Sequence, residues 1–529
     1  MEEGRGGRGM GAEEGRVWAA CRAPRVAISA RPGSSFAAGL LGVWAAGCAA
    51  VPVAPGAAAA EVRHAMDVAG VKAAVGAAGE RSQLGRTGVP WVEVADTARA
   101  DFVDPVAPGA GDPRRLRGEG DEGWAERSGA LVLFTSGSTG RPKAVVHTHG
   151  SVRSQCETLA AAWGVGASDA VLHCLPVNHI HGLVNALLCP LGAGARVDFM
   201  PKFEPRQVWR ELEDGRVTVF MGVPAMYAKL LRTWREAEAA GGGDPGRPGE
   251  GFGFDPGAAA RGARGLRLAV SGSAACPVPV LEEWRRVTGG EVPLERFGMT
   301  ETGMVLSNPL QAGGRRAGLV GEPMGQMECR VVADDHDPSS PGQGQAAGGS
   351  NGSTEGELRV RGPQLFTAYL GDEAATRAAF DEDGFFRTGD VVRREGPDGS
   401  WYRVLGRASV DILKTGGHKV SALEVEGALL ECAGVREAAV VGIPSPVMGH
   451  VLAAAVALEP GADTALDQEA LTAHLRAHLS SYKLPKVYRF VPALPRNAMG
   501  KVNKRDLVAT LFDDNTQSGG AKCAKAEHV

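Results

Sequence analysis

The sequence Leu131-Val-Leu-Phe-Thr-Ser-Gly-Ser-Thr-Gly-Arg-Pro-Lys-Ala144 contains the most informative pattern in the chain. It opens with an apolar run, Leu131 to Phe134, which predicts a buried strand. The strand leads into a loop of Thr, Ser and Gly that ends at Lys143. Small residues let backbone N–H groups approach anionic oxygens, hydroxyls donate further hydrogen bonds, and a lysine adds positive charge. The loop therefore predicts phosphate binding.

This loop differs from a Walker A loop, in which Gly-Lys is followed directly by Ser or Thr. Here Arg141 and Pro142 separate Gly140 from Lys143, and Ala144 follows. A loop rich in Ser and Gly is also typical of a flexible connection, so its composition alone leaves both interpretations open.

Length and composition predict at least two domains, because 529 residues are too many for one core. A hydrophobic content of 44% and a net charge of −4 suit a globular protein, and no long basic run predicts nucleic-acid binding. The nine cysteines are scattered without a CxxC pair, which favours reduced thiols. His147, His149, His179 and His181 lack Cys or carboxylate ligands at metal spacing, so we expect no zinc site.

The N-terminal part of the chain raises two questions about location. Residues 1–25 are rich in Gly, Arg and Glu, and their acidic residues do not fit an organellar targeting peptide. Residues 32–60 carry no charge, and an uncharged segment of this length could form a transmembrane helix. Pro52 and Pro55 interrupt that segment, so we expect a core helix and a strand at 50–53 instead, the helix packing through Phe36, Leu40, Leu41 and Trp44.

The rest of the chain alternates between strand-like and helix-like apolar patterns, which predicts an α/β architecture. Helices are expected within 61–77, before a short strand, and at 150–163, 181–192, 226–240 and around 280–287, with strands at 170–175, 217–223 and 266–270. Segments 241–260 and 336–353 are dense in Gly, Pro, Ser and Asp and predict loose insertions. Helices at 423–430 and 466–479 and strands at 438–443 and 451–458 predict a compact C-terminal α+β unit.

Five further motifs follow the opening loop. They are Ser271-Gly-Ser-Ala-Ala275, Glu295-Arg-Phe-Gly-Met-Thr-Glu-Thr302, Thr388-Gly389-Asp390, Gly406-Arg-Ala-Ser-Val-Asp-Ile-Leu-Lys-Thr-Gly-Gly417 and Pro495-Arg-Asn-Ala-Met-Gly-Lys-Val502. Taken singly, each is typical of an ordinary turn or a solvated polar loop. Together, in this order, the motifs resemble those of the adenylate-forming superfamily, which includes acyl-CoA synthetases, peptide-synthetase adenylation domains and luciferases.

The resemblance covers residues from about Arg25 to Leu507 and implies a fold and a domain division. It implies an α/β protein with a large N-terminal adenylation domain and a small mobile α+β C-terminal domain, with the site between them. We expect the adenylation domain at 26–407, the C-terminal domain at 408–512 and a tail at 513–529.

The resemblance also implies roles for individual residues. Lys143, Thr300, Glu301 and Lys501 would be catalytic, with Glu301 holding Mg²⁺ and Lys501 on a mobile loop. Ser409 would be the hinge between the domains, and Lys414, Gly416 and Gly417 would face CoA. The implied ATP-binding residues are Thr135, Ser136, Gly137, Ser138, Thr139, Gly140, Lys143, Ser271, Gly272, Ser273, Glu295, Gly298, Met299, Thr300, Asp390, Arg407 and Lys501.

Within the superfamily, the details are similar to malonyl-CoA synthetases, some of which are mitochondrial. These details are His179-Ile-His-Gly182, Met221-Gly-Val-Pro224, Glu295-Arg296 and Arg315-Arg-Ala-Gly-Leu-Val-Gly321. A dicarboxylate carries a second charge that needs a partner when enclosed, and a guanidinium can pair with it in a forked arrangement. The resemblance implies Arg296 as the first such partner and His181 as the second. The alternative for Arg296 is a structural ion pair with a neighbouring carboxylate such as Glu295.

We therefore expect an ATP-dependent ligase that uses ATP, Mg²⁺ and CoA to form malonyl-CoA through a malonyl-adenylate. The alternatives are a ligase for methylmalonate or for a short- or medium-chain acid, and an adenylate-binding protein without turnover. The last arises because the sequence resembles family members only from near Arg25, so their first strand and helix have no counterpart here. A mitochondrial location is implied by resemblance alone, with the cytoplasm as the alternative, and the oligomeric state is left open.

Overall fold

The computed structural model describes residues 20–77 except 30, then 84, 87–94, 123, 127–135, 142–240, 253–333 except 312, 354–462, 466–496 and 502–512. The chain divides into two compact units. The first unit comprises 1–276, 283–330 and 359–387, and the second unit comprises 277–282, 331–358 and 388–529. Each unit is described separately below.

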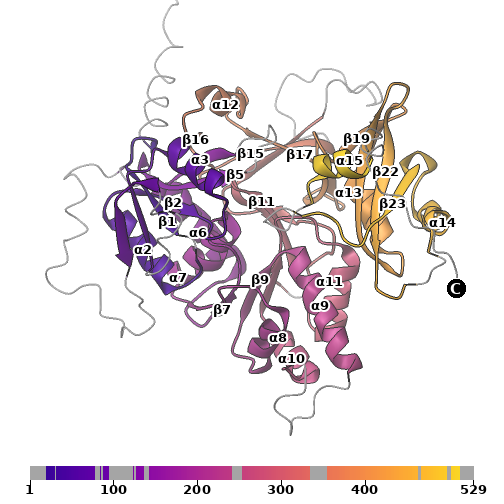
Figure 1. Ribbon diagram of the computed structural model, residues 1–529, viewed down its shortest axis with the longest axis horizontal. Helices are drawn as coiled ribbons and strands as arrows, with labels where there is room; N and C mark the ends of the chain where they lie inside the picture. The colour runs from indigo at the N-terminus through magenta and orange to yellow at the C-terminus, as the bar shows by residue number, and fades with distance from the viewer. Residues whose placement is uncertain are drawn as a thin grey trace, which may run out of the picture. The chain divides into compact units, whose positions relative to one another are not determined.

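The first unit contains two seven-stranded sheets, of which the first has the order β16-β6-β5-β2-β1-β3-β4. Its central pairs are parallel, and β6 and β16 add an antiparallel edge. Helices α2 (Ser34–Ala45) and α3 (Ala59–Ala69) pack on it (Figure 1). The strands are β1 (Arg25–Ser29), β2 (Ala49–Val53), β3 (Ala73–Ala77), β4 (Trp91–Val94), β5 (Gly129–Thr135), β6 (Lys143–Thr148) and β16 (Ala368–Tyr369).

The predicted core helix at the start of the chain is α2, and the strand after it is β2. Phe36 and Leu40 are buried, as expected, but Leu41 is 55% exposed. The expectation that Leu41 packs in the core is therefore wrong. The buried position in the last turn is Val43, which lies three residues after Leu40 on the same helical face.

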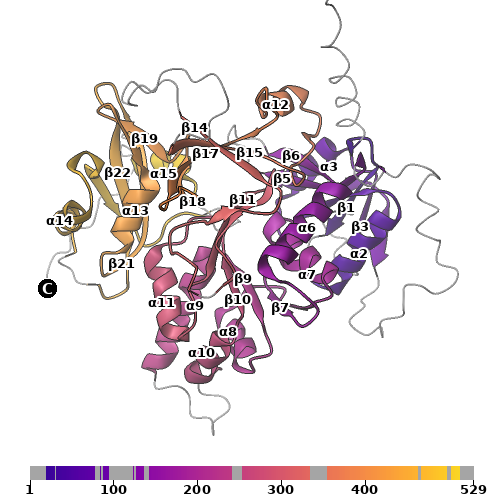
Figure 2. The same ribbon diagram turned by 180° about the vertical axis from the view of Figure 1, so that it is seen from behind.

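The second sheet of the first unit has the order β13-β12-β11-β10-β9-β7-β8. Strands β7 to β11 run parallel, whereas β12 and β13 are antiparallel to their neighbours. Helices α8 (Pro205–Glu213) and α9 (Pro224–Ala239) lie beside this sheet (Figure 2). The strands are β7 (Ala170–His173), β8 (Arg196–Phe199), β9 (Val219–Gly222), β10 (Leu268–Ser271), β11 (Leu294–Met299), β12 (Gly303–Ser307) and β13 (Glu322–Pro323).

Helix α6 (His149–Trp163) links the two sheets, since it contacts β5 and β6 of the first sheet and β12 of the second. Its last residue, Trp163, is fully buried and donates from Nε1 to Ser307 Oγ at 3.0 Å. Helix α6 thus connects the strand after the Ser/Gly loop to the strand after the Glu295–Thr302 motif.

The helix expected at 181–192 is a π-helix over His181–Leu188, named η4, followed by one turn of α-helix, α7 (Cys189–Gly192). The backbone N–H of Cys189 donates to Val184 O, five residues earlier. A widened turn of this kind is rare and is found mostly at functional sites.

Part of the insertion expected to be loose at 241–260 is ordered helix. Helix α10 (Pro256–Arg264) starts at Pro256, and the Asp255 carboxylate accepts from Ala258 N at 2.8 Å. An Asp cap, a proline at the first helical position and a run of alanines favour a helix start. The prediction is therefore wrong from residue 256 onward, and the insertion at 336–353 lies outside the described residues.

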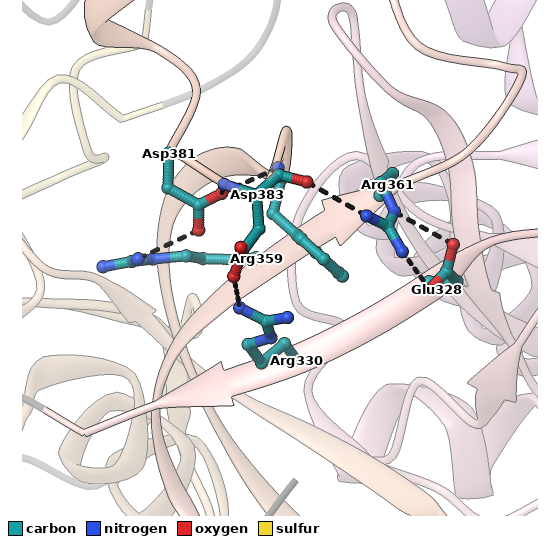
Figure 3. Close-up of polar contacts among 7 residues, drawn as sticks. Glu328, Arg330, Arg359, Arg361, Asp381 and Asp383 are labelled. Atoms are coloured by element: carbon teal, nitrogen blue, oxygen red, sulfur yellow. Dashed lines mark hydrogen bonds and ion pairs between the residues drawn. The ribbon is translucent and has the colours of Figure 1, made fainter. Parts of the chain in front are cut away.

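A third sheet, β14-β15-β17-β18, has four strands. Within the first unit, ion pairs hold the turn before β17 (Figure 3). Arg361 contacts both carboxylate oxygens of Glu328 at 3.0 and 2.8 Å and donates to Asp383 O at 3.0 Å. Arg359 and Arg330 pair with Asp381 and Asp383 at 3.1 and 2.7 Å. The strands are β14 (Glu328–Val332), β15 (Glu355–Arg361), β17 (Phe386–Glu395) and β18 (Trp401–Arg407), and helix α12 (Glu373–Ala378) precedes β17.

The second unit contains the predicted C-terminal elements in a five-stranded sheet of order β20-β19-β22-β21, with β23 paired to β22. Lys504 lies at the start of α15 and contacts Asp411 at 2.6 Å and Glu426 at 2.7 Å. The elements are β19 (Ile412–Thr415), β20 (His418–Ser421), α13 (Ala422–Leu430), β21 (Val435–Ser445), β22 (Gly449–Leu458), α14 (Gln468–His478), β23 (Val487–Phe490) and α15 (Lys504–Leu511). In the described part of the chain, no helix is long and apolar enough to cross a membrane.

Asp169, just before β7, provides a test of the packing. Its buried carboxylate accepts from Gly166 N at 3.0 Å, Thr218 Oγ1 at 2.7 Å and Arg267 Nε at 2.7 Å. We expect Asp169→Asn to lower the free energy of unfolding by about 2–3 kcal/mol near neutral pH, because one charge-assisted acceptor becomes a donor facing Arg267. Urea unfolding measures the change.

The pH dependence of that effect has a definite sign. Burial raises the pKa of Asp169, but the hydrogen bonds from Arg267, Gly166 and Thr218 outweigh it, so the pKa lies below the ordinary value. The added stability is therefore present above the unfolded-state pKa of about 4 and is lost as pH falls through the folded-state pKa. The control is Asp198→Asn, since the Arg196–Asp198 pair is exposed and should contribute less than about 1 kcal/mol. Equal effects of the two variants would contradict this assignment.

Candidate active site

The Ser/Gly loop joins two antiparallel strands of the first unit, β5 and β6. Thr135 at the end of β5 is the register partner of Lys143 at the start of β6. The two ends of the loop are therefore side by side, with the lysine at its base. The loop residues Ser136, Gly137, Ser138, Thr139 and Gly140 lie outside the described residues, and their role in phosphate binding stays a prediction.

Lys143 and Glu301 both contact the side chain of Tyr369. Lys143 Nζ is 4.4 Å from the centroid of the Tyr369 ring, and the Tyr369 hydroxyl donates to Glu301 Oε1 at 3.1 Å. Tyr369 is in β16, which pairs with β6, so the strand pairing brings its side chain to Lys143. Sequence reasoning missed Tyr369, because it lies in no motif and its position depends on a long-range strand pairing.

Thr300 and Glu301 form a turn between β11 and β12 whose backbone is held by its neighbours. His147 Nε2 donates to Thr300 O at 2.7 Å, and Phe366 N donates to Glu301 O at 2.7 Å. Burial lowers the pKa of His147 to about 4, despite the opposing hydrogen bond to Thr300, so the imidazole is neutral at physiological pH.

The Glu301 carboxylate fits a magnesium ion chemically. Its side chain is buried, and one of its oxygens is oriented by the Tyr369 hydroxyl. Mg²⁺ prefers hard oxygen ligands and commonly takes one or two carboxylates together with substrate phosphates. Among the described residues there is no cluster of three or more His, Cys, Asp or Glu side chains suited to a metal ion. A site here would therefore depend on phosphate oxygens for its other ligands.

A second polar cluster in the first unit joins Arg296, Ser273 and His181. Arg296 Nη2 donates to Ser273 Oγ at 3.4 Å, and Ser273 Oγ lies 3.2 Å from His181 Nδ1. Arg296 and His181 are 4% and 5% exposed, and neither Arg296 Nε nor His181 Nε2 has a hydrogen-bond partner among the residues that the structure describes. Burial lowers the pKa of Arg296 to about 9, and burial together with the Arg296 charge lowers the pKa of His181 well below its usual value.

The backbone at residues 272 and 273 is shaped to leave space for this guanidinium. A Cβ on Gly272 would lie 2.5 Å from Arg296 Cζ, closer than any side chain can approach. Ser273 has φ of 70°, a left-handed conformation that non-glycine residues rarely adopt. Strain of this kind is concentrated at functional sites. Ser273, expected beside ATP, thus contacts the two residues expected to bind the acid.

The alternative of a structural ion pair between Arg296 and Glu295 does not occur. Successive residues of a strand point to opposite faces, and both residues lie in β11. Glu295 is buried, and its Oε2 accepts from Gly318 N at 2.6 Å. Among the described residues, no carboxylate lies within ion-pair distance of Arg296.

The other residues expected at ATP in the first unit lie at the ends of strands β10 and β11. Ser271 ends β10 and is buried, while Met299 N donates to Thr302 Oγ1 at 3.2 Å. A Cβ on Gly298 would lie 2.2 Å from Gly303 O, so this position has no room for a side chain. Their contact with a nucleotide stays a prediction.

In the second unit, Asp390 and Arg407 are register partners in β17 and β18, and Arg407 Nε lies 3.1 Å from Asp390 Oδ1. The predicted hinge residue Ser409 is exposed in the turn after β18. The Gly416-Gly417 pair has φ of 54° and 83° and forms the tight turn between β19 and β20, and the exposed Lys414 lies two residues before Gly416. Lys501 lies outside the described residues.

The profile of the AMP-binding enzyme family matches residues 21–370, and that of the AMP-binding enzyme C-terminal domain matches residues 424–501. The chain therefore belongs to the AMP-binding enzyme family. The predicted fold class, a large N-terminal α/β part followed by a smaller C-terminal part, is confirmed.

Similar proteins include several CoA ligases. A probable CoA ligase of Humulus lupulus is 41% identical over 403 residues, covering 72% of this chain and 61% of the relative. A malonate–CoA ligase of Arabidopsis thaliana is 36% identical, covering 92% and 78%, and the mitochondrial malonate–CoA ligase of Mus musculus is 40% identical, covering 75% and 67%. The chain thus spans less than two thirds of the Humulus relative.

A solved structure extends the similarity to almost the whole chain. The ATP-bound MatB of Rhodopseudomonas palustris has a TM-score of 0.73 and 28% identity, covering 95% of this chain and 93% of that structure. Family and relatives support the predicted class of enzyme, an AMP-forming acid–CoA ligase.

Because the buried charge of Arg296 lacks a carboxylate partner among the described residues, its removal should stabilise the ligand-free protein. Replacing a buried charge by an apolar side chain of similar volume often stabilises a protein. We expect Arg296→Met to raise the free energy of unfolding of the ligand-free protein by about 1–4 kcal/mol, measured by urea unfolding.

The matched control is Arg315→Met, because Arg315 donates to Val292 O at 2.9 Å and Leu310 O at 3.2 Å. Its removal leaves these two carbonyls without a donor and should cost about 1–3 kcal/mol. If Arg296→Met destabilises the protein as much as Arg315→Met, Arg296 has a structural role instead.

Proposed function

We propose that the protein is an AMP-forming acid–CoA ligase whose acid substrate is malonate. The observation that carries this proposal is the buried guanidinium of Arg296, which has no carboxylate partner among the described residues. A buried charge without a partner is destabilising, and a substrate carboxylate would remove that penalty. Two of the relatives described above are malonate–CoA ligases by name.

The Arg296–Ser273–His181 cluster offers two donors to such a carboxylate. Because the Ser273 hydroxyl accepts from Arg296, it can donate its own hydrogen to His181 Nδ1. The neutral imidazole then carries its hydrogen on Nε2, the atom that has no partner in the described part of the chain. Arg296 Nε and His181 Nε2 would together bind the carboxylate of malonate that does not react.

The first reaction step joins the other carboxylate of malonate to AMP. The carboxylate oxygen attacks the α-phosphorus of ATP, the bond to the bridging oxygen breaks, and pyrophosphate leaves a malonyl-adenylate. Lys143 at the base of the Ser/Gly loop would neutralise charge on the phosphates, and Lys501 would do so at the α-phosphate. Glu301 would hold Mg²⁺, which supplies further charge neutralisation when bound.

The second step transfers the malonyl group to CoA. The CoA thiol attacks the activated carbonyl, the bond to AMP breaks, and malonyl-CoA and AMP are the products. We propose that Asp390 and Arg407 bind the ribose, that Ser409 is the hinge between the two steps, and that Lys414, Gly416 and Gly417 lie near CoA. The Mus musculus relative is mitochondrial by name, and we propose the same location for this protein.

A panel of acids tests the substrate. We expect ATP- and acid-dependent pyrophosphate release to be fastest with malonate, slower with methylmalonate and slowest with monocarboxylates such as butyrate or hexanoate. Arg296→Met should lower kcat/KM for malonate on the order of 10²- to 10³-fold, because it removes the partner of a buried charge, and should leave butyrate far less affected.

Arg315→Met is the control here too, since it should change stability without changing the order of preference among the acids. If the purified protein prefers hexanoate to malonate, malonate is not its substrate, although the acid–CoA ligase activity still holds. Absence of pyrophosphate release with every acid would favour the adenylate-binding protein without turnover.

A further inference from the structure

We propose that His147 is a positioning residue for the Thr300–Glu301 turn, and that it sets the affinity with which the ATP-bound protein takes up Mg²⁺. This inference rests on the proposed function, because it assumes that Glu301 holds the ion. It adds His147, a residue of β6 that none of the sequence motifs identified. Strand β6 is in a different sheet from β11 and β12, the strands on either side of Glu301.

The hydrogen bonds of His147 determine which of its nitrogens carries the hydrogen. Gln155 Nε2 lies 3.3 Å from His147 Nδ1 and 3.0 Å from Gln364 O. An amide NH₂ group has two hydrogens and can donate to both atoms, whereas the opposite orientation of the amide would bring its oxygen against the Gln364 carbonyl oxygen, which can only accept. His147 Nδ1 is therefore an acceptor.

With Nδ1 as acceptor, the hydrogen of the neutral ring is on Nε2 and points at Thr300 O, 2.7 Å away. His147 has no exposed surface, and it donates to this partly buried carbonyl. A carbonyl that loses its donor is costly, and the turn would shift toward another partner if His147 were apolar. His147 thus fixes the direction of the Thr300 carbonyl.

The turn is also held on its other side. Phe366 N donates to Glu301 O at 2.7 Å, and Gln364, two residues earlier, accepts the second hydrogen of Gln155. The Gln155 side chain packs so closely on Gly303 that a Cβ there would lie 2.6 Å from its Cδ. Two successive carbonyls of the turn are therefore oriented by buried donors, which fixes the backbone from which the Glu301 carboxylate extends.

The orientation of a carboxylate ligand decides how well it meets the short, regular coordination of Mg²⁺. The Tyr369 hydroxyl orients Glu301 Oε1, while His147 and Phe366 orient the backbone behind it. Loss of the His147 donor would leave the charge of Glu301 in place but make its position less defined. Binding of Mg²⁺ should suffer more than binding of ATP alone.

Calorimetric titration of the full-length protein tests the inference. ATP is titrated with Mg²⁺ and with EDTA, and the ratio of the two dissociation constants measures how strongly Mg²⁺ promotes ATP binding. We expect His147→Leu to reduce this ratio about 10- to 100-fold, with little change in the EDTA titration. His147→Gln, whose amide nitrogen can occupy the place of Nε2, should keep the ratio within about 3-fold of the wild type.

Trp163→Phe is the matched control, because it removes another buried side-chain donor, the one to Ser307 Oγ, near the opposite end of α6. It should lower the melting temperature without changing the ratio. If His147→Leu behaves in the same way, His147 is structural and the inference is wrong. Should His147→Leu fail to fold, His147→Asn replaces it, since its shorter amide cannot reach Thr300 O and should lower the ratio equally. A wild-type protein that does not bind ATP with Mg²⁺ would refute the proposed function and this inference together.

Discussion

The burial of the Arg296 charge is the constraint on which the candidate acid site depends. A guanidinium removed from water without an anionic partner is destabilising by several kcal/mol, of the order of about half of the net stability of a typical domain. The surrounding chain is adapted to keep it there: Gly272 provides the space, and Ser273 accepts from it in a left-handed conformation. No carboxylate of the described residues pairs with it, and the malonate proposed above would supply one.

The two polar clusters of the first unit come from different parts of the chain and have different chemistry. Lys143, Tyr369 and Glu301 combine a cation, a ring and a carboxylate, which suits phosphate and a hard metal ion. The Arg296–Ser273–His181 cluster has only donors left for a ligand, which suits a carboxylate. The clusters are connected through β11, which carries Arg296 and ends just before the Thr300–Glu301 turn.

The sequence was sufficient for the fold class, the order of most elements and the strand at the start of the Ser/Gly loop, because these follow from local apolar patterns. It was insufficient where distant segments decide the outcome. Tyr369 reaches Glu301 only through the pairing of β16 with β6, and His147 reaches Thr300 only because α6 contacts both β6 and β12. The π-helical turn after His181 and the helix at Pro256 also differ from expectation, since hydrogen-bond spacing and capping are not expressed in apolar periodicity.

In the Arg296–Ser273–His181 cluster, the hydrogen bonds make the effect of changing one residue depend on the others. Removing Arg296 alone would leave the buried His181 Nε2 hydrogen beside an apolar substrate, and a buried donor without a partner costs about 1–3 kcal/mol. Removing His181 alone would leave the guanidinium as isolated as before. If malonate binds as proposed, making both positions apolar together should favour monocarboxylates more than the change at Arg296 alone. Because Gly272 and Ser273 contact Arg296, whereas Tyr369 contacts Lys143 and Glu301, such a change would leave Lys143, Tyr369 and Glu301 in place.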